Sequence, residues 1–412
     1  MSGFHHGYSI WSLFSMFYCV LLASCLVVVS AQPGDARRTS QHPWSYKSKI
    51  DCSPGHYPPD YCTLTKAYFH HSDRIFYLNT THSIPNPAWS TQLWTTKTVN
   101  IKSDIQCHHL YHKAFIFTFF FYYGHSNNFH LHYDTLIPIY SQLRFIESSN
   151  QLPLSNQSIV LMPTVEKKRM EILDWDTDAF TSTYKDSYFM EALKVLTGPH
   201  AFLPMSKASF NQYPNAKTCF EEAKLGTPRV EFTDKKLIQG YISFILRRLR
   251  IKKTTPKAAR IALIKRTNRR LILNQDELIN SVKSLANIEL VDFNGMTFKQ
   301  QVKLMRKYSV LIGMNGAGLM NGLFLPKGAV NIQLVPYKAQ LNFKEFGSLL
   351  SVRGPYLEWH NQHEHLNRDV PGDNYHGQAD TIVKVDEFVE LIKKALNTGL
   401  NAKLQKRVKT EL

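Results

Sequence analysis

The chain has 412 residues, of which 43% are hydrophobic and 20% are charged. This composition excludes a disordered or collagen-like chain, and the length predicts two domains rather than one hydrophobic core. A formal net charge of +17 favours anionic partners, whether nucleic acid, an acidic membrane face or a phosphate-bearing small molecule, although a basic solvated surface explains it equally well.

Residues 1–31 predict a signal peptide or a signal anchor. Ile10 to Ala31 contain no Asp, Glu, Lys or Arg, and the small residues before Gln32 fit a signal-peptidase site. At roughly 20 residues the stretch is also long enough to span a bilayer. Either alternative places the rest of the chain in the secretory lumen, where nucleic acid is not an expected partner. A membrane is a partner only if the leader is uncleaved.

Three further features agree with a lumenal compartment. Asn79 and Asn156 begin N-glycosylation sequons. Disulfides are expected, in one of three pairings, among the four cysteines after the leader: Cys52, Cys62, Cys107 and Cys219. The C-terminal residues Lys409–Leu412 differ at one position from the Lys-Asp-Glu-Leu signal, which predicts a retrieval receptor as a partner. We expect the lumen of the endoplasmic reticulum, or alternatively a type II membrane protein of the endoplasmic reticulum or Golgi.

The first half of the chain begins with an irregular stretch. Residues 32–102 have no sustained period and are interpreted as an N-terminal extension or stem. The aromatic run from Ala114 to Tyr123 is typical of a strand buried on both faces. A turn or cap over residues 124–127 precedes an apolar-periodic segment at residues 128–145, and a second short strand is predicted at residues 158–162.

The second half alternates strand and helix, which predicts a parallel sheet whose ligand lies beyond the carboxyl ends of the strands. The predicted strands are residues 259–265, 288–292, 309–313 and 329–335, and the predicted helices start at Asn274 and at Phe298. Asn274 with Glu277 has the pattern of a capping box, and the helix it starts would bury Leu278, Val282 and Leu285. Asp386 could cap a last helix that ends at Leu396, followed by a flexible basic tail over residues 397–412.

Three segments carry candidate chemistry. The run Lys265–Asn274, at the end of a predicted core strand, holds Arg266 and Arg270, whose guanidinium groups match phosphate oxygens. The run Leu311–Asn321 leads from a strand through glycines into a helix, where backbone amides can approach a diphosphate. His130 and Asp134 are four residues apart, so on a helix they share one face and can exchange a proton.

A fourth segment offers a metal-dependent alternative. Asp174, Asp176 and Asp178 have the DxD spacing by which many glycosyltransferases hold a divalent cation, although the same aspartates could cap a following helix.

Together these segments resemble glycosyltransferase family 61 over residues 124–396. The resemblance rests on three motifs: Asn127, His130 and Asp134 in the first; Arg266, Arg270, Asn274, Glu277 and Leu278 in the second; Asn315, Gly316, Ala317, Gly318 and Leu319 in the third. In the family the third motif begins with histidine. Asn315 can donate a hydrogen bond in its place but cannot titrate near neutral pH.

The resemblance implies an α/β fold of two Rossmann-like domains facing a cleft, of the GT-B type. Residues 103–235 would form the acceptor domain and residues 236–396 the donor-binding domain. It further implies an inverting glycosyltransferase that moves a sugar, with UDP-GlcNAc as the expected donor, onto a hydroxyl of a glycoprotein or glycan. Arg266, Arg270 and the residues from Asn315 to Leu319 would hold the donor, and His130 or Asp134 would be the base. No metal and no cofactor is expected.

Two alternatives remain open at this point. One is a metal-dependent transferase that uses Asp174 to Asp178. The other is a catalytically inactive protein of the endoplasmic reticulum that has kept the fold, lost turnover through Asn315, and binds glycans or glycoproteins.

Overall fold

The fold is taken from a computed structural model of the chain. The residues that it describes are 47–52, 61–70, 75–79, 95–98, 107, 109–120, 127–148, 158–164, 187–197, 217–226, 230, 232–252, 254–339, 345–371 and 377–411. The predicted leader, the sequon at Asn156, the Asp174–Asp178 segment and Leu412 lie outside these ranges. Within the described ranges, no helix has both the length and the apolar character needed to cross a bilayer.

The second half of the chain forms a five-stranded sheet in which every neighbouring pair is parallel. Its strands are β8 (Arg260–Ile264), β9 (Asn287–Val291), β10 (Val310–Met314), β11 (Val330–Val335) and β12 (Tyr356–His360). The strand order is β12-β11-β10-β8-β9. In chain order this is 2-1-3-4-5, the doubly wound arrangement. Four strands agree with the sequence prediction. Sequence reasoning missed β12, an edge strand in which Trp359 alone is buried.

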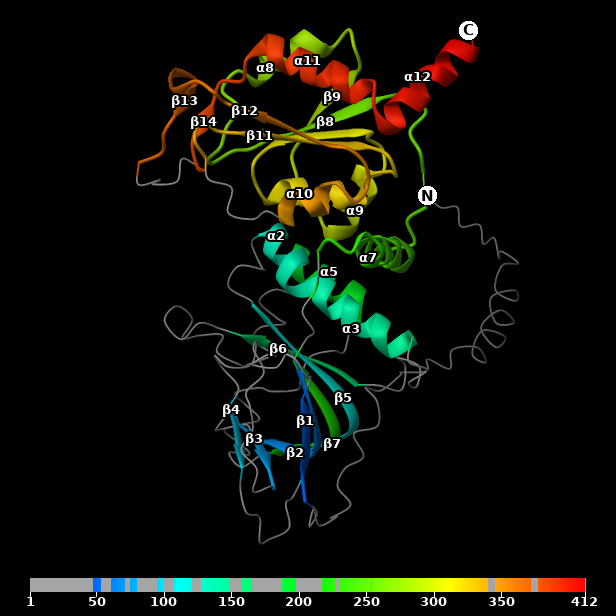
Figure 1. The fold of residues 1–412 in the computed structure, drawn as a ribbon, viewed down its shortest axis with the longest axis vertical. Coiled ribbons are helices and arrows are strands. Elements are labelled where there is room, and N and C mark those ends of the chain that lie inside the picture. The colour runs from blue at the N-terminus through cyan, green and yellow to red at the C-terminus, as the bar shows by residue number, and fades with distance from the viewer. Residues whose placement is uncertain are drawn as a thin grey trace, which may run out of the picture. The chain divides into compact units, whose positions relative to one another are not determined.

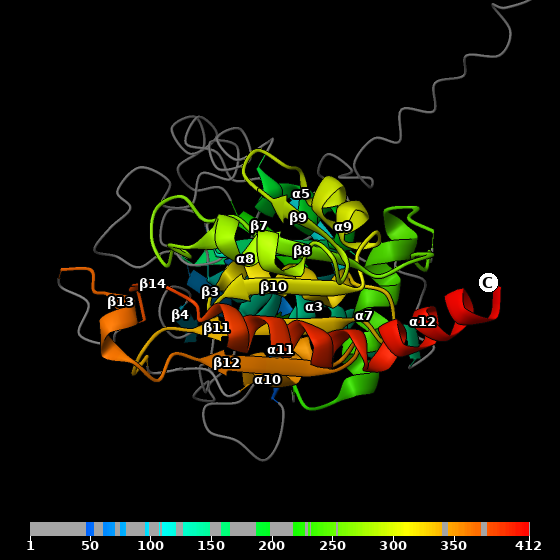
Figure 2. The ribbon, with the colours of Figure 1, turned by 90° about the horizontal axis from the view of Figure 1, so that it is seen from above.

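Helices cover both faces of this sheet. One face carries α8 (Gln275–Val282) and α11 (Val385–Leu396), which pack on each other (Figures 1 and 2). The other carries α9 (Phe298–Met305), α10 (Glu345–Leu350) and the 3₁₀ helix η3 (Ala317–Phe324) (Figure 1). Each strand contributes to both cores because successive side chains alternate between the faces. On β8, Leu263 packs towards α8 and α11, and Ala262 packs towards α9 and η3.

One predicted helix cap is correct in position but lacks the predicted bonds, and a second is wrong. Asn274 is the N-cap of α8, but its side chain makes no capping bond. Instead its Nδ2 donates to the Val383 carbonyl at 2.8 Å and its Oδ1 accepts from the Val383 amide at 3.0 Å. A tertiary contact with the segment before α11 therefore takes the groups that a capping box would use. At the other helix, Lys384 is the N-cap of α11, so Asp386 lies inside the first turn.

The apolar stripe of α8 is only partly as predicted. Leu278 and Val282 are fully buried, but α8 ends at Val282, and Leu285 is exposed.

The basic C-terminal segment is helical rather than flexible. Residues Gly399–Glu411 form α12, and Leu400, Asn401 and Leu404 are buried. The Leu400 amide donates to the Gly328 carbonyl at 2.7 Å. The apolar positions at the start of this segment therefore attach it to the fold, which its high content of lysine obscures in the sequence.

The first half of the chain contributes a mixed seven-stranded sheet. Its strands are β1 (Lys49–Cys52), β2 (Tyr61–His70), β3 (Ile75–Leu78), β4 (Thr95–Thr98), β5 (His109–Phe120), β6 (Ser158–Thr164) and β7 (Lys217–Gly226). β5 pairs in parallel with β6 and β7, whereas β2 is antiparallel to β7. The aromatic strand β5 lies between β7 and the edge strand β6, and its Ala114, Phe115 and Ile116 are buried, as expected.

The sequence interpretation of residues 32–102 as an irregular stem is corrected by this sheet. Strands β1 to β4 all fall within that range, and β2 joins them to β7 in the same sheet. The chain is thus of the mixed α/β class, as expected. Its division at residue 236 into an acceptor and a donor-binding domain, and the arrangement of two such domains around a cleft, remain predictions.

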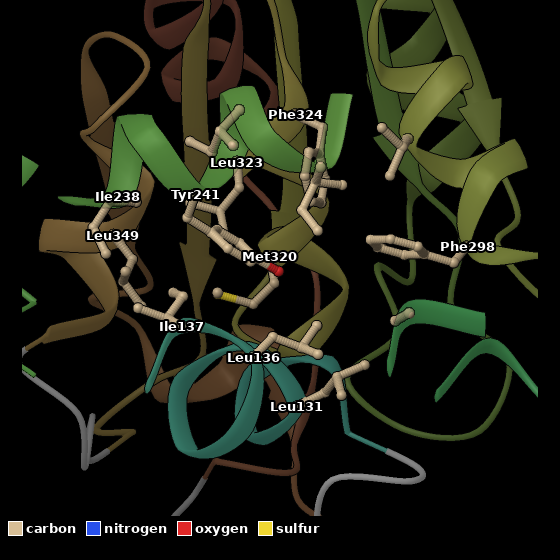
Figure 3. Packing of buried hydrophobic residues seen from close by; sticks show 14 of the residues in the cluster. Leu131, Leu136, Ile137, Ile238, Tyr241, Phe298, Met320, Leu323, Phe324 and Leu349 are labelled. Atoms are coloured by element: carbon tan, nitrogen blue, oxygen red, sulfur yellow. The ribbon is translucent and has the colours of Figure 1, made fainter. Parts of the chain in front are cut away.

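The helices between the two sheets share one hydrophobic cluster with the second sheet. They are α2 (Asn128–His130), the π-helix η1 (Leu131–Leu136), α3 (Ile137–Ser148), α5 (Tyr188–Thr197) and α7 (Lys235–Arg248). In Figure 3, Leu131, Leu136 and Ile137 face Met320 and Leu323 of η3. Side chains from distant parts of the sequence thereby fix the position of η3 relative to the helix that carries His130.

Two disulfides resolve the pairing that the sequence left open. Cys52 is bonded to Cys62 and Cys107 to Cys219. Cys52 and Cys62 lie opposite each other on the antiparallel strands β1 and β2. Disulfides fit a protein of an oxidising, secretory compartment.

Removal of the Cys107–Cys219 bond is expected to destabilise the fold more than removal of the Cys52–Cys62 bond. The two bonds join residues 112 and 10 positions apart. In the chain-entropy model this corresponds to losses of about 5 and about 3 kcal/mol. Urea unfolding of the two double Cys→Ala variants measures both. An equal or larger loss for the Cys52–Cys62 variant would contradict the expectation.

Candidate functional site

The two segments that sequence analysis assigned to donor binding meet at one edge of the parallel sheet. Lys265–Asn274 follows β8, and Asn315–Leu319 follows β10, and these two strands are hydrogen-bonded neighbours. From β8 the chain continues to β9 on one side, and from β10 it continues to β11 on the other. The carboxyl ends of β8 and β10 therefore form the topological switch point, where doubly wound sheets bind their ligands.

At this switch point two guanidinium groups approach Gly316. A Cβ atom added to Gly316 would lie 2.8 Å from Nη1 of Arg266 and 3.1 Å from Nη1 of Arg270. The first distance is shorter than real Cβ contacts and the second is tight, so a side chain at Gly316 would displace the Arg266 guanidinium and crowd that of Arg270. Sequence analysis named these three residues separately, and the fold brings them into contact.

Hydrogen bonds hold the side chain of Arg270 in position, although its backbone conformation is unfavourable. Its backbone is left-handed, with φ of 56°, which is unfavourable for a residue with a side chain. Nη1 donates to the carbonyl of Asn315 at 2.6 Å, and Nη2 donates to Oε1 of Gln378 at 3.2 Å. The next residue, Leu271, donates its amide to Oδ1 of the buried Asp380 at 2.8 Å.

Sequence reasoning missed Gln378 and Asp380. They lie more than one hundred residues after the loop that they contact. The sequence signal for a buried polar contact was a single acidic residue, Asp380, close to the apolar residues Ile382 and Val383.

Arg266 is a partly buried cation that has no carboxylate partner among the residues that the structure describes. Its Nε donates to the carbonyl of Arg269 at 2.8 Å, and within the described ranges it makes no ion pair. Burial, and to a lesser extent the charge of Arg269, lower the pKa of Arg266. The group stays protonated at neutral pH because free guanidinium has so high a pKa. A partly desolvated charge of this kind is stabilised when an anion binds beside it.

The helix η3 begins directly at this site. Gly316 is its N-cap and Ala317 its first residue. The first amide groups of a helix have no partners within the helix, so those of Ala317 and Gly318 are donors available to an anion. The side chain of Leu319 is fully buried. It therefore anchors η3 in the core and does not contact a ligand.

Two further arginines secure the other end of η3. Arg306 donates from Nη1 to the carbonyl of Phe324 at 2.9 Å, and Arg353 donates from Nε to the carbonyl of Leu325 at 3.0 Å. Burial, together with the nearby charge of Arg353, lowers the pKa of Arg306 to about 10. Both groups are therefore cationic at neutral pH and satisfy carbonyls that the end of a helix leaves without partners.

His130 and Asp134 form the pair that the sequence predicted. Nδ1 of His130 and Oδ2 of Asp134 are 2.6 Å apart, and both side chains are largely buried, at 18% and 20% exposure. Asn127 caps the helix, since its Oδ1 accepts from the Phe129 amide at 3.0 Å. The pair spans α2 and the π-helix η1, and π-turns of this kind occur frequently at functional sites. α2 packs against η3, the helix that starts at Gly316.

His132, on the same π-helix, faces the core instead. It is fully buried, its Nδ1 lies 2.8 Å from the hydroxyl of Tyr241, and its ring packs near Phe298 and Phe324. Burial lowers the pKa of His132 to about 3, so the imidazole is neutral in the folded protein at physiological pH. His132 thus links the helix that carries His130 to α7, and has no place in the proton chemistry.

The metal-dependent alternative is not tested by this geometry. Asp174, Asp176 and Asp178 lie outside the described ranges, and within those ranges no group of three His, Cys, Asp or Glu side chains is placed to hold a metal ion.

Comparison with known proteins points to one family. Residues 128–332 match the family model described as Glycosyltransferase 61. This match spans His130, Asp134, Arg266, Arg270 and Asn315, and therefore includes every residue of the site that the sequence predicted.

Similar curated proteins carry consistent names. The chain is 28% identical over 256 residues to an EGF domain-specific O-linked N-acetylglucosamine transferase of Gallus gallus, covering 55% of this chain and 45% of the relative. The Drosophila melanogaster protein of the same name is 27% identical over 266 residues, covering 58% and 48%. A protein O-linked-mannose beta-1,4-N-acetylglucosaminyltransferase 2 of Xenopus tropicalis is 31% identical over 134 residues, covering 31% and 23%. The chain thus spans less than half the length of these relatives.

The buried His132 predicts an acid-sensitive fold. Its folded-state pKa lies below the value of about 6.5 expected in the unfolded chain, so the unfolded state binds a proton first as the pH falls. The stability that this neutral histidine contributes is complete above about pH 6.5 and is lost towards about pH 3. Between about pH 7.5 and about pH 5 the loss is about 2 kcal/mol.

Urea unfolding at these two pH values measures the effect. His132→Gln, which cannot titrate, is expected to reduce the pH dependence by that amount. An unaltered pH dependence in His132→Gln would contradict the assignment.

Proposed function

We propose, from the premise that residues 128–332 form a glycosyltransferase 61 domain, that this chain is an inverting N-acetylglucosaminyltransferase. It would transfer GlcNAc from UDP-GlcNAc to a hydroxyl group of a glycoprotein or glycan in the secretory pathway. The family match and the names of the similar proteins support a glycosyltransferase with this donor. We do not assign the acceptor. EGF domains and O-linked mannose occur in the names of the relatives and describe those proteins.

The observation that carries the proposal is the approach of Arg266 and Arg270 to Gly316 at the switch point. A nucleoside diphosphate is the ligand whose chemistry fits this arrangement, because guanidinium groups bind phosphate oxygens in pairs and stay charged. The amides of Ala317 and Gly318 would add donors from the start of η3. The diphosphate gains negative charge as the sugar leaves, so these groups stabilise the transition state more than the bound donor.

His130 is the proposed general base. Asp134 accepts the hydrogen bond from Nδ1 and so orients the ring, and the proton of the acceptor hydroxyl would be taken through Nε2. The carboxylate also stabilises the imidazolium that forms. Direct attack by the deprotonated hydroxyl on the anomeric carbon, opposite to the leaving diphosphate, inverts the configuration at that carbon.

Asn315 stands where the family resemblance places a histidine. Its backbone carbonyl accepts from Arg270, so the main chain at this position already contributes to the site. Its side-chain amide is proposed to donate a hydrogen bond to a phosphate oxygen of the donor, a role that needs no titration. An inactive glycan-binding protein is the alternative if the family histidine has to transfer a proton.

The two disulfides support a secretory location for this activity. The endoplasmic reticulum is the proposed compartment, with Lys409–Leu412 read by a retrieval receptor. Lys409 to Glu411 lie at the end of α12, so a receptor would meet this signal at the end of a helix.

The first experiment measures release of UDP. The chain from Gln32 to Leu412, expressed in secreted form, is incubated with a panel of UDP-sugars with and without EDTA. Slow release from UDP-GlcNAc that resists EDTA is expected, because arginines rather than a metal ion bear the diphosphate charge. Release that EDTA abolishes would move the site to Asp174–Asp178. A folded protein that neither binds nor hydrolyses any donor would leave the binding-protein alternative.

Variants at the two halves of the site are expected to separate binding from turnover. Arg266→Ala removes a charge from the diphosphate site and should weaken UDP binding by about ten- to one-hundredfold, as expected for a charge-assisted hydrogen bond. Asp134→Asn should keep UDP binding within about threefold, while turnover falls by about one hundredfold or more, because His130 loses the carboxylate that orients its ring and stabilises its imidazolium. Calorimetric titration with UDP and initial rates with donor measure the two quantities.

Arg269→Ala is the matched control, since this arginine lies in the same loop with an exposed side chain and contacts Arg266 through its backbone carbonyl. Its loss should alter UDP binding by less than about threefold, the size of a screened surface charge. Turnover close to that of the wild type in Arg266→Ala would refute the donor-site assignment.

A further inference from the structure

A segment from the end of the chain lies along the arginine loop. We call residues 378–383 the strap. The Thr381 amide donates to the carbonyl of Leu271 at 2.8 Å, and the Leu273 amide donates to the carbonyl of Thr381 at 2.9 Å. Farther along, the side chain of Asn274 makes two hydrogen bonds to the backbone of Val383. The strap thus pairs with the loop continuously from Leu271 to Asn274.

The strap also fixes the backbone of Arg270. This residue has the left-handed conformation, which a side chain makes unfavourable, so contacts from elsewhere must maintain it. Its amide donates to the carbonyl of Gln378 at 3.2 Å. Asp380 adds an anchor, because its Oδ1 accepts from Leu271 and its Oδ2 pairs with Arg368. The buried carboxylate therefore sets the register in which Gln378 faces Arg270.

The side chain of Gln378 completes the support of the guanidinium. One nitrogen of Arg270 is bonded to Asn315 on the loop after β10, and the other is bonded to Gln378 on the strap. These two bonds hold the plane of the guanidinium from opposite branches of its fork. The rotation that a long side chain would otherwise have is thereby restricted before a ligand binds.

The partner of Arg270 on the strap, Gln378, is an amide and not a carboxylate. Glutamine accepts the hydrogen bond without carrying charge, whereas a glutamate at the same place would form an ion pair with Arg270. A carboxylate would neutralise the cation that a diphosphate needs, and would have to be displaced or repelled on binding. An amide keeps the guanidinium in position and leaves its charge for the ligand.

From these contacts we propose that Gln378 is a positioning residue of the donor site. It holds Arg270 through a neutral acceptor, so that the guanidinium is pre-oriented towards a nucleoside diphosphate by a bond that takes none of its charge. This assignment rests on the proposed function. It adds a residue from outside the segment that matches the family, which ends at residue 332.

Two variants of the full chain test the assignment. Gln378→Met keeps the size and removes the acceptor, and Gln378→Glu keeps an acceptor and adds a charge. We expect UDP to bind about tenfold more weakly to Gln378→Met, as for one lost hydrogen bond to a charged group. Gln378→Glu should bind at least as weakly as Gln378→Met, because its carboxylate opposes the diphosphate. In both variants the KM for UDP-GlcNAc should rise and kcat should fall, because Arg270 also stabilises the leaving diphosphate, while the KM for the acceptor changes by less than about threefold.

Gln405→Glu is the control for added charge. Gln405 is exposed on α12, which lies at the other end of the sheet from β13 (Asn367–Arg368) and β14 (Asp380–Thr381) in both views (Figures 1 and 2). The affinity of the Gln405→Glu variant for UDP should equal that of the wild type. Thermal unfolding of all three variants should stay close to that of the wild type, since the backbone bonds of the strap are kept.

The outcomes separate this assignment from the proposed function. If the wild-type chain binds UDP and both Gln378 variants bind it equally well, the positioning role is overturned and the proposed function stands. If Gln378→Glu binds UDP as tightly as the wild type while Gln378→Met does not, the need for a neutral acceptor is overturned. A wild-type chain that does not bind UDP overturns the proposed function, and the assignment of Gln378 with it.

Discussion

The site depends on the close approach of two guanidinium groups to one backbone position. Arg266 and Arg270 repel each other, and a side chain at Gly316 would press on both guanidinium groups. Such an arrangement is unfavourable in the absence of an anion, because two neighbouring cations lose part of their hydration. The parallel sheet makes it possible. β8 and β10 are adjacent and end at the same edge, so the loops that follow them must meet.

Neutral acceptors bind four arginines around η3. Arg270 is bonded to a backbone carbonyl and an amide side chain, Arg266 to a backbone carbonyl, and Arg306 and Arg353 to carbonyls at the end of η3. Carbonyl groups fix geometry but do not neutralise charge, so the positive potential at the start of η3 is preserved. This explains how a strongly basic protein can direct part of its charge to a specific site.

A buried hydrophobic contact connects the arginine site to the His130–Asp134 pair. α2 packs against η3, and the π-helix that follows α2 places Leu131 and Leu136 in the same cluster as Met320 and Leu323. His132 fixes this π-helix to Tyr241 of α7 from the other side. Because interiors are closely packed, these contacts determine where the proposed base lies relative to the loop that receives the donor.

The sequence by itself determined the local features of this protein: the parallel strands, the helical spacing of His130 and Asp134, the arginine run and the glycine loop. These follow from periodicity and from residue chemistry within short windows. Only the tertiary structure decided which distant groups meet. Asn274 bonds Val383 instead of capping its helix, β1 to β4 join a sheet instead of forming a stem, and Gln378 and Asp380 support a loop more than one hundred residues earlier. Such contacts leave no periodic signal, because a single polar side chain acquires its partner only when the chain folds.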